Sequence, residues 1–226
     1  MSGNIQNTCL RCGTCCIQGG PALHRQDLDL VRSDRIALSR LITVRKGELA
    51  HNPKTGRVQT VRAELVKISG TGQDWRCGYY DEVHKGCGIY GHRPQACEVL
   101  KCWDTEEILG LVEQDLLSRL AILEADNPIV PLLIEHERIC PCPDLEGIAG
   151  GLADLSAAVK TEMEALVGRD LRFRTKVIRE HGLQLAEELF YFGRPLFQLL
   201  QQLGIRISET PAGIALYWPT RKDGGA

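Results

Sequence analysis

The stretch Cys9-Leu-Arg-Cys12-Gly-Thr-Cys15-Cys16 is the most distinctive segment of this chain, because it places four cysteines within eight residues. A tetrahedral zinc ion with Zn–S bonds of about 2.3 Å holds its sulfurs about 3.8 Å apart, a separation that a C-x2-C turn provides. Cys9 with Cys12, and Cys12 with Cys15, have this spacing. If the segment is helical, Cys9, Cys12 and Cys16 fall within about 60° of one another, whereas Cys15 and Cys16 diverge by about 100°. We therefore expect Cys15 and Cys16 to serve different centres or different iron atoms.

A second group of four cysteines follows with the spacing Cys77-x9-Cys87-x9-Cys97-x4-Cys102. Pro94 is suited to the first turn of a helix, and Cys97 and Cys102 would lie about 140° apart on one continuous helix. Either that helix ends before Cys102 or the two thiols face different centres. The two groups together predict eight metal ligands, either in two four-thiolate centres built jointly or in one multi-iron cluster with a separate zinc ion.

Composition excludes several partners. The chain has 226 residues, with 27 basic and 29 acidic side chains and a pI near 6.3. It therefore lacks the net positive charge that would attract nucleic acid or an anionic membrane. The longest apolar runs are far shorter than the roughly 20 residues that span a bilayer, and the first residues lack the features of a signal peptide. We expect a cytoplasmic, reduced protein, in which ten cysteines indicate metal binding rather than disulfides.

Other residues near the cysteines admit two interpretations. In Cys140-Pro141-Cys142 the proline extends Cys140, so both side chains leave one face about 6 to 7 Å apart, and whether this pair binds metal stays open. Histidines that could replace a cysteine ligand, or serve as surface or outer-sphere groups, are His84, His92 and His136. Five cationic side chains lie within four residues of a cysteine. They would either favour the thiolate form of the cysteines or belong to a solvated surface. They are Arg11, Arg76, Lys85, Arg93 and Lys101.

The remaining pattern predicts an α+β fold. Residues 1–104 form a small cysteine-rich metal-binding domain, in which Leu41 to Ser69 make a short antiparallel hairpin or a three-stranded sheet. Residues 105–226 form a mainly helical half, which we expect either as a companion region or packed as one unit with the first. We find no internal repeat.

Within the helical half, a capping-box pattern predicts a helix from Thr105 to Glu124. An apolar stripe predicts one helix from Ile148 to Leu166 whose apolar side faces the core. Further helices between 173 and 203 break at His181-Gly182 and at Gly193-Arg194-Pro195, and residues 205–207 and 214–218 predict a closing β-hairpin.

The cysteine pattern resembles the bacterial YkgJ-type cysteine-cluster family, described as a zinc- or iron-chelating domain. The resemblance rests on the C-x2-C-x2-CC motif at Cys9 to Cys16 and on Cys87-Gly-Ile-Tyr90-Gly-His-Arg93-Pro94-Gln-Ala-Cys97, with Cys77 and Cys102 flanking it. It covers about residues 7 to 104. The family often carries the label of an iron–sulfur oxidoreductase, so the resemblance implies that activity as an expectation.

Two functions remain in competition. The first is a redox protein that holds iron, as one or more iron–sulfur clusters such as a 4Fe–4S cube, and passes electrons to an unidentified partner. The second is a zinc-stapled structural module that recruits a protein partner without catalysis. We favour iron–sulfur binding, because the adjacent Cys15-Cys16 and the additional Cys140 and Cys142 exceed what one or two structural zinc ions need. No residue is marked out as catalytic.

Overall fold

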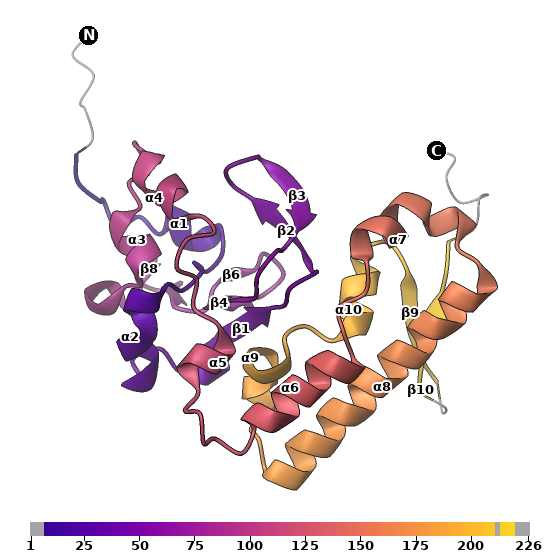
Figure 1. Ribbon diagram of the computed structural model, residues 1–226. Helices are drawn as coiled ribbons and strands as arrows, with labels where there is room; N and C mark the ends of the chain where they lie inside the picture. Colours follow the sequence, from indigo (N-terminus) through magenta and orange to yellow (C-terminus); the bar gives the residue numbers. More distant parts are fainter. Residues whose placement is uncertain (1–6, 211–212, 220–226) are drawn as a thin grey trace.

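A computed structural model describes residues 7–210 and 213–219, and its α+β fold confirms the predicted class (Figure 1). The first half combines short strands and short helices, and the second half is mainly helical with a β-hairpin at its end. The helices are α1 (Thr14–Ile17), α2 (Leu28–Arg32), α3 (Gln95–Val99), α4 (Glu106–Leu111), α5 (Arg119–Ile122), α6 (Val130–Ile139), α7 (Leu145–Gly151), α8 (Ala157–His181), α9 (Glu188–Phe192) and α10 (Leu196–Gln201). The strands are β1 (Leu41–Val44), β2 (Leu49–Asn52), β3 (Arg57–Thr60), β4 (Leu65–Ile68), β5 (Gly70–Thr71), β6 (Arg76–Cys77), β7 (Tyr80–Asp81), β8 (Gly86–Cys87), β9 (Arg206–Thr210) and β10 (Gly213–Tyr217).

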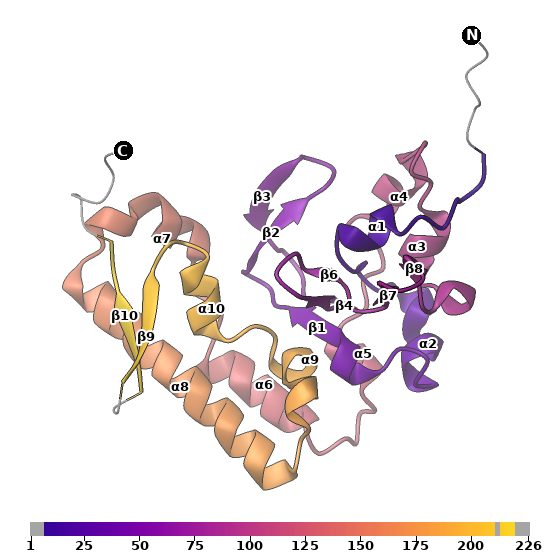
Figure 2. The ribbon, with the colours of Figure 1, turned by 180° about the vertical axis from the view of Figure 1, so that it is seen from behind.

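Residues 41–68 form two nested strand pairs, so the prediction of one hairpin or a three-stranded sheet was wrong. β1 pairs with β4 in an antiparallel manner, and β2 pairs with β3 between them as a separate two-stranded sheet. The chain turns between β1 and β2 at Gly47, whose φ of 96° ends the extended backbone. The β2–β3 hairpin consequently projects as an arm beside the rest of the cysteine-rich half (Figure 1, Figure 2).

Two successive ten-residue hairpins, residues 69–78 and 79–88, follow this arm and correct the expectation that no internal repeat exists. Each hairpin pairs its second residue with its cysteine, Gly70 with Cys77 and Tyr80 with Cys87. Trp75 and Lys85 occupy the same position in the two units, with φ values of 52° and 50°. The two sequences share only the final Cys-Gly, so the repeat exists in the backbone and was nearly invisible in the residues.

Two of the predicted helices are interrupted. The helix expected from Thr105 to Glu124 is divided into α4 and α5, because Glu113 and Asp115 have positive φ values of 65° and 43°. The single helix expected from Ile148 to Leu166 is divided into α7, a 3-10 turn at Leu152–Asp154 and α8. Ser156 starts the new helix, since its side chain accepts a hydrogen bond from the Val159 amide. The apolar stripe nevertheless lies in the core as predicted.

The end of the chain follows most of the predictions, but residues 173–181 continue α8, which runs from Ala157 to His181, and do not form a further helix. α8 ends at His181, where Gly182 adopts a left-handed conformation with φ of 61°. Pro195 separates α9 from α10. β9 and β10 pair as the expected closing hairpin, and the two residues between them lie outside the described part of the chain. Among the described residues, no helix is both long and apolar enough to span a bilayer.

The cysteine-rich half and the helical half share one apolar core. The larger buried cluster combines Leu41, Val66 and Ile68 of β1 and β4 with Phe190 and Phe192 of α9. A second cluster lies wholly toward the end of the chain, among α7, α8, α10 and the closing hairpin.

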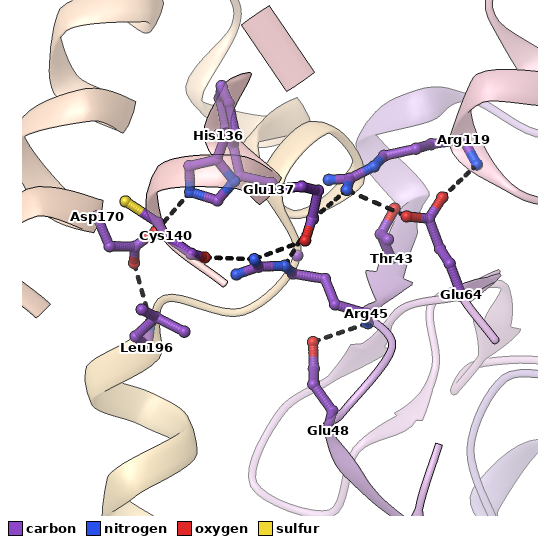
Figure 3. A network of polar contacts seen from close by, with 12 residues as sticks. Thr43, Arg45, Glu48, Glu64, Arg119, His136, Glu137, Cys140, Asp170 and Leu196 are labelled. Atoms are coloured by element: carbon purple, nitrogen blue, oxygen red, sulfur yellow. Dashed lines mark hydrogen bonds and ion pairs between the residues drawn. The ribbon is translucent and has the colours of Figure 1, made fainter. Parts of the chain in front are cut away.

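A buried polar network accompanies this core (Figure 3). Arg45, which follows β1, is 0 % exposed and forms a two-pronged ion pair with Glu137 of α6, at 2.7 and 2.8 Å. Arg119 of α5 is 1 % exposed and contacts the same carboxylate and that of Glu64. The network therefore ties the strand region to the helices α5 and α6.

Candidate metal centre

Five of the eight predicted ligand cysteines gather where α1, α3 and the tandem hairpins meet. Cys15 and Cys16 lie on α1, Cys97 lies on α3, and Cys77 and Cys87 end the second strands of the two hairpins. The hairpin repeat explains the ten-residue spacing of Cys77 and Cys87, because each hairpin delivers its cysteine at the same point. Gly13 permits α1 to approach them, since a Cβ at this position would lie 2.5 Å from the Tyr80 ring and 3.0 Å from the Lys85 carbonyl oxygen.

Cys16 is the central thiol of this group. Its thiol is placed to donate either to the Cys15 sulfur or to the Cys87 sulfur. These contacts lower the pKa of Cys15 and of Cys87 to about 6 each and raise the pKa of Cys16 far above its ordinary value. One S–H proton serves one thiolate at a time, so Cys15 and Cys87 compete for it and the three thiols titrate as a unit. In this trio Cys15 and Cys87 are the potential thiolates, and Cys16 keeps its proton.

Cys77 and Cys97 complete the group at longer range. Burial raises the pKa of Cys77, and burial also raises that of Cys97 to about 12. The charges of Cys15 and Cys87 act on both of them in the same direction. All five thiols are therefore electrostatically coupled, and a bound cation would favour their ionised forms.

Cys9, Cys12 and Cys102 are exposed, and the charge of Cys15 acts on the Cys12 thiol as well. The helical arrangement considered for Cys9, Cys12 and Cys16 was wrong, because only Thr14–Ile17 is helical in this segment. The Cys9 sulfur accepts a hydrogen bond from the Arg11 amide, and the Cys12 sulfur lies 3.1 Å from the Thr14 hydroxyl. α3 ends at Val99, which resolves the alternative posed for Cys97 and Cys102: the helix does end before Cys102.

Arg93 is the cation that acts most widely on the cysteine group. Its charge lowers the pKa of Cys15, Cys87 and Cys97. The guanidinium lies over the Tyr90 ring at 3.9 Å, and Arg11 lies 4.0 Å from the same ring. Tyr90 therefore connects the first cysteine motif to the second through two cation–π contacts.

The other expected groups are engaged elsewhere. Arg76 pairs with Asp74 and Glu82, and Lys101 pairs with Glu107. Among the histidines, His84 is exposed and bonds Asp81 at 2.7 Å, whereas His92 lies near Arg35. The sequence did not indicate Lys67 of β4, whose positive charge lowers the pKa of Cys77. The two lie ten positions apart in the sequence, so no local motif could have indicated this pairing.

Cys140 belongs to a different cluster, with His136 and Asp170. Within residues 7–210 and 213–219, these three side chains form the one set of metal-type donor atoms that all lie within 4.8 Å of one another. The His136 Nε2 atom lies 2.6 Å from Asp170, which also accepts from Arg174 at 2.8 Å and from the Leu196 amide at 3.0 Å. Hydrogen bonds thus already occupy both carboxylate oxygens, and the cluster joins α6, α8 and α10 (Figure 3). Cys142 packs against Gly47.

Comparison with known proteins identifies the class of domain. Residues 8–114 match the family model CxxCxxCC, described as "Putative zinc- or iron-chelating domain". The match confirms the resemblance of this part of the chain to the cysteine-cluster family and supports metal binding. No curated protein and no solved structure matches the chain.

Proposed function

We propose that the two cysteine groups hold iron as an iron–sulfur cluster, and that the protein exchanges electrons with a partner in the reducing cytoplasm. The observation that carries the proposal is the convergence of five thiols from three parts of the chain, with the adjacent Cys15 and Cys16 in one group. Five converging thiols exceed the four that close a zinc site. A cluster with several irons can accept adjacent cysteines on different metal atoms.

The spread of the thiols also supports a cluster over a single ion. A zinc ion would hold its thiolates about 3.8 Å apart, whereas no three of the eight cysteines, all of which the structure describes, lie within 4.8 Å of one another. We propose that Cys15, Cys16, Cys77, Cys87 and Cys97 supply the inner ligands. The exposed Cys9, Cys12 and Cys102 would complete the set when their segments close over the metal.

Zinc is the second candidate, favoured by the C-x2-C spacing of Cys9 with Cys12. In that case the metal would staple α1 to the hairpins, and the helical half would recruit a protein partner. Structural zinc sites contribute folding free energy directly and need no redox partner.

Metal analysis of anaerobically purified protein distinguishes the two. We expect iron and acid-labile sulfide in equal amounts, absorption near 400 nm, and an electron paramagnetic resonance signal that appears or disappears on reduction with dithionite. Colourless protein with one or two zinc ions per chain, which unfolds when a chelator removes them, would establish the zinc alternative and refute the iron–sulfur proposal.

A further inference from the structure

A cavity of about 1220 Å³ opens beside the cysteine group. Residues of the β2–β3 arm line one side of it, and residues of α1, α3 and α4 line the other. Figures 1 and 2 show where these elements lie. Cysteine side chains that line it are Cys15, Cys16, Cys77, Cys87 and Cys97. A pocket of this size exceeds what a metal cluster alone needs and is ample for a small organic ligand.

The β1–β4 pair forms the floor of the cavity with one face of the sheet. Side chains alternate between the faces of a strand, so Val66 and Ile68 enter the core while Leu65 and Lys67 face the opposite way. Their cross-strand partners, Val44 and Ile42, line the cavity as well. The floor is thus apolar except for one lysine.

Lys67 is a cation without an ionic partner inside the described structure. Arg194 also lines the cavity but pairs with Glu48 at 2.6 Å, and Glu113 at its rim bonds Asn52. Lys67 makes no side-chain hydrogen bond or ion pair with any residue of 7–210 or 213–219. Burial lowers the pKa of Lys67, and the neighbouring charge of Arg194 lowers it further. An unpaired ammonium among apolar side chains costs free energy that a bound anion would recover.

We propose that this cavity binds a small organic monocarboxylate, whose acid group pairs with Lys67 and whose apolar body lies against Ile42, Val44 and Leu65. Arg62 also lines the cavity but is exposed, and Arg194 already pairs with Glu48, so Lys67 is the cation over the apolar floor that is available to one carboxylate. The ligand would lie beside the cysteine group whichever metal that group holds, so this inference does not rest on the identity of the metal.

A rival role for Lys67 makes the inference testable. Cys77 is the nearby ionisable thiol, so the ammonium could instead only offset negative charge that this thiol acquires when it binds a metal. In that case removing the charge would lower the metal content and leave ligand binding unchanged.

The experiment uses the full-length, metal-loaded protein and two probes of equal chain length, decanoate and decanol. Displacement of a fluorescent fatty-acid analogue by each probe gives its Kd below the micellar concentration, and the metal content of every sample is measured. We expect decanoate to bind at least tenfold more tightly than decanol. Lys67→Met should remove that preference without loss of metal, and Lys67→Arg should restore it. Lys46→Met is the matched control, since this lysine is exposed and outside the cavity.

Three results would overturn the inference. The first is failure of wild-type protein to bind decanoate. The second is equal affinity of wild-type protein for decanoate and decanol, which would leave only a nonspecific apolar groove. The third is loss of metal from Lys67→Met with the decanoate preference intact, which would assign Lys67 to the thiolates. The first two rest on wild-type protein alone, so they apply even if Lys67→Met does not fold.

Discussion

The charge state of the cysteine group depends on one proton and one guanidinium. Cys16 keeps its proton between Cys15 and Cys87, and Arg93 favours the ionised form of both neighbours. A thiol whose pKa falls from 9.0 to about 6 on folding contributes stability in full above pH 9. That contribution declines as the pH falls toward 6 and is lost below it. Metal-free protein should therefore lose stability on acidification across this range.

Arg93→Met tests the electrostatic part of this arrangement. In metal-free protein, iodoacetamide should modify the coupled trio of Cys15, Cys16 and Cys87 with a midpoint below the ordinary cysteine pKa of 9.0. Loss of the guanidinium should move this midpoint to higher pH, because the thiolates lose a favourable charge. Mass spectrometry of peptides alkylated at several pH values measures the shift. Arg76→Met should leave the midpoint unchanged, since Arg76 pairs with Asp74 and Glu82. Equal profiles for Arg93→Met and wild type would exclude the role assigned to Arg93.

Cys87→Ser should remove most of the bound metal. Cys87 contacts Cys16 and ends the second hairpin, so its loss removes an inner donor of the proposed site and a hydroxyl replaces it poorly. Metal analysis of the purified variant measures the effect. Cys142→Ser is the matched control, because Cys142 packs against Gly47 away from the group and should retain wild-type metal. Full metal in Cys87→Ser would show that the ligand set is wrong.

At the scale of elements, the site depends on how closely α1 approaches the tandem hairpins. α1 has only four residues and would be unstable alone. Contact with the hairpin 79–88 holds it, and Gly13 permits that contact with φ of 74° and no side chain. The positions of Cys15 and Cys16 therefore depend on the packing of α1 against the hairpins.

Gly13→Ala should weaken both the fold and the metal site. The added methyl group would lie 2.5 Å from Tyr80, and a left-handed alanine costs about 1–2 kcal/mol before that clash is counted. We expect the free energy of unfolding to fall by about 1–3 kcal/mol and metal affinity to fall in chelator competition. Gly110→Ala is the control, since it lies in α4 with nothing within 4 Å. It should be neutral or stabilise by about 0.5–1 kcal/mol. Unchanged metal affinity in Gly13→Ala would show that the position of α1 does not determine metal binding.

At the scale of the whole molecule, the cysteine-rich and helical halves share their core and their buried charges. Thr43 of β1 donates to the Phe190 carbonyl of α9 at 2.5 Å, and Glu137 of α6 neutralises both Arg45 and Arg119. We propose that residues 1–104 and 105–226 unfold as one unit. Separation would expose apolar surface of β1, part Arg45 from Glu137 and part Arg119 from Glu64.

Glu137→Gln tests this coupling. Two buried arginines would lose their shared partner, and we expect the free energy of unfolding to drop by about 2–4 kcal/mol, somewhat less than for a fully buried pair. Urea unfolding followed by tryptophan fluorescence and by far-ultraviolet circular dichroism measures the change and shows whether the two transitions coincide. Glu135→Gln, on the same helix, removes only an exposed pair with Arg138 and should cost less than about 0.5 kcal/mol. Separate transitions in the wild type would refute the single unit.

The amino-acid sequence by itself determined the local features. Cysteine spacing indicated a metal site and a family, Pro195 and Gly182 marked helix ends, and the alternation of residues 205–218 indicated the closing hairpin. These signals are readable because they depend on the chemistry or backbone preference of neighbouring residues. The interruptions at Glu113 and Asp115 were not readable, because glutamate rarely adopts left-handed backbone and one aspartate, although it does so more often, is a weak signal by itself.

Only the tertiary structure decided which cysteines meet and what surrounds them. Cys16 contacts Cys87, which lies 71 positions further along the chain, and Lys67 reaches the same region from a strand that carries no cysteine. The hairpin repeat shares only Cys-Gly, because backbone pairing and not side-chain identity sustains it. Long-range packing brings together residues that are far apart in the sequence, and their spacing forms no local motif. The cavity and the position of Lys67 in it could therefore be recognised only in the tertiary structure.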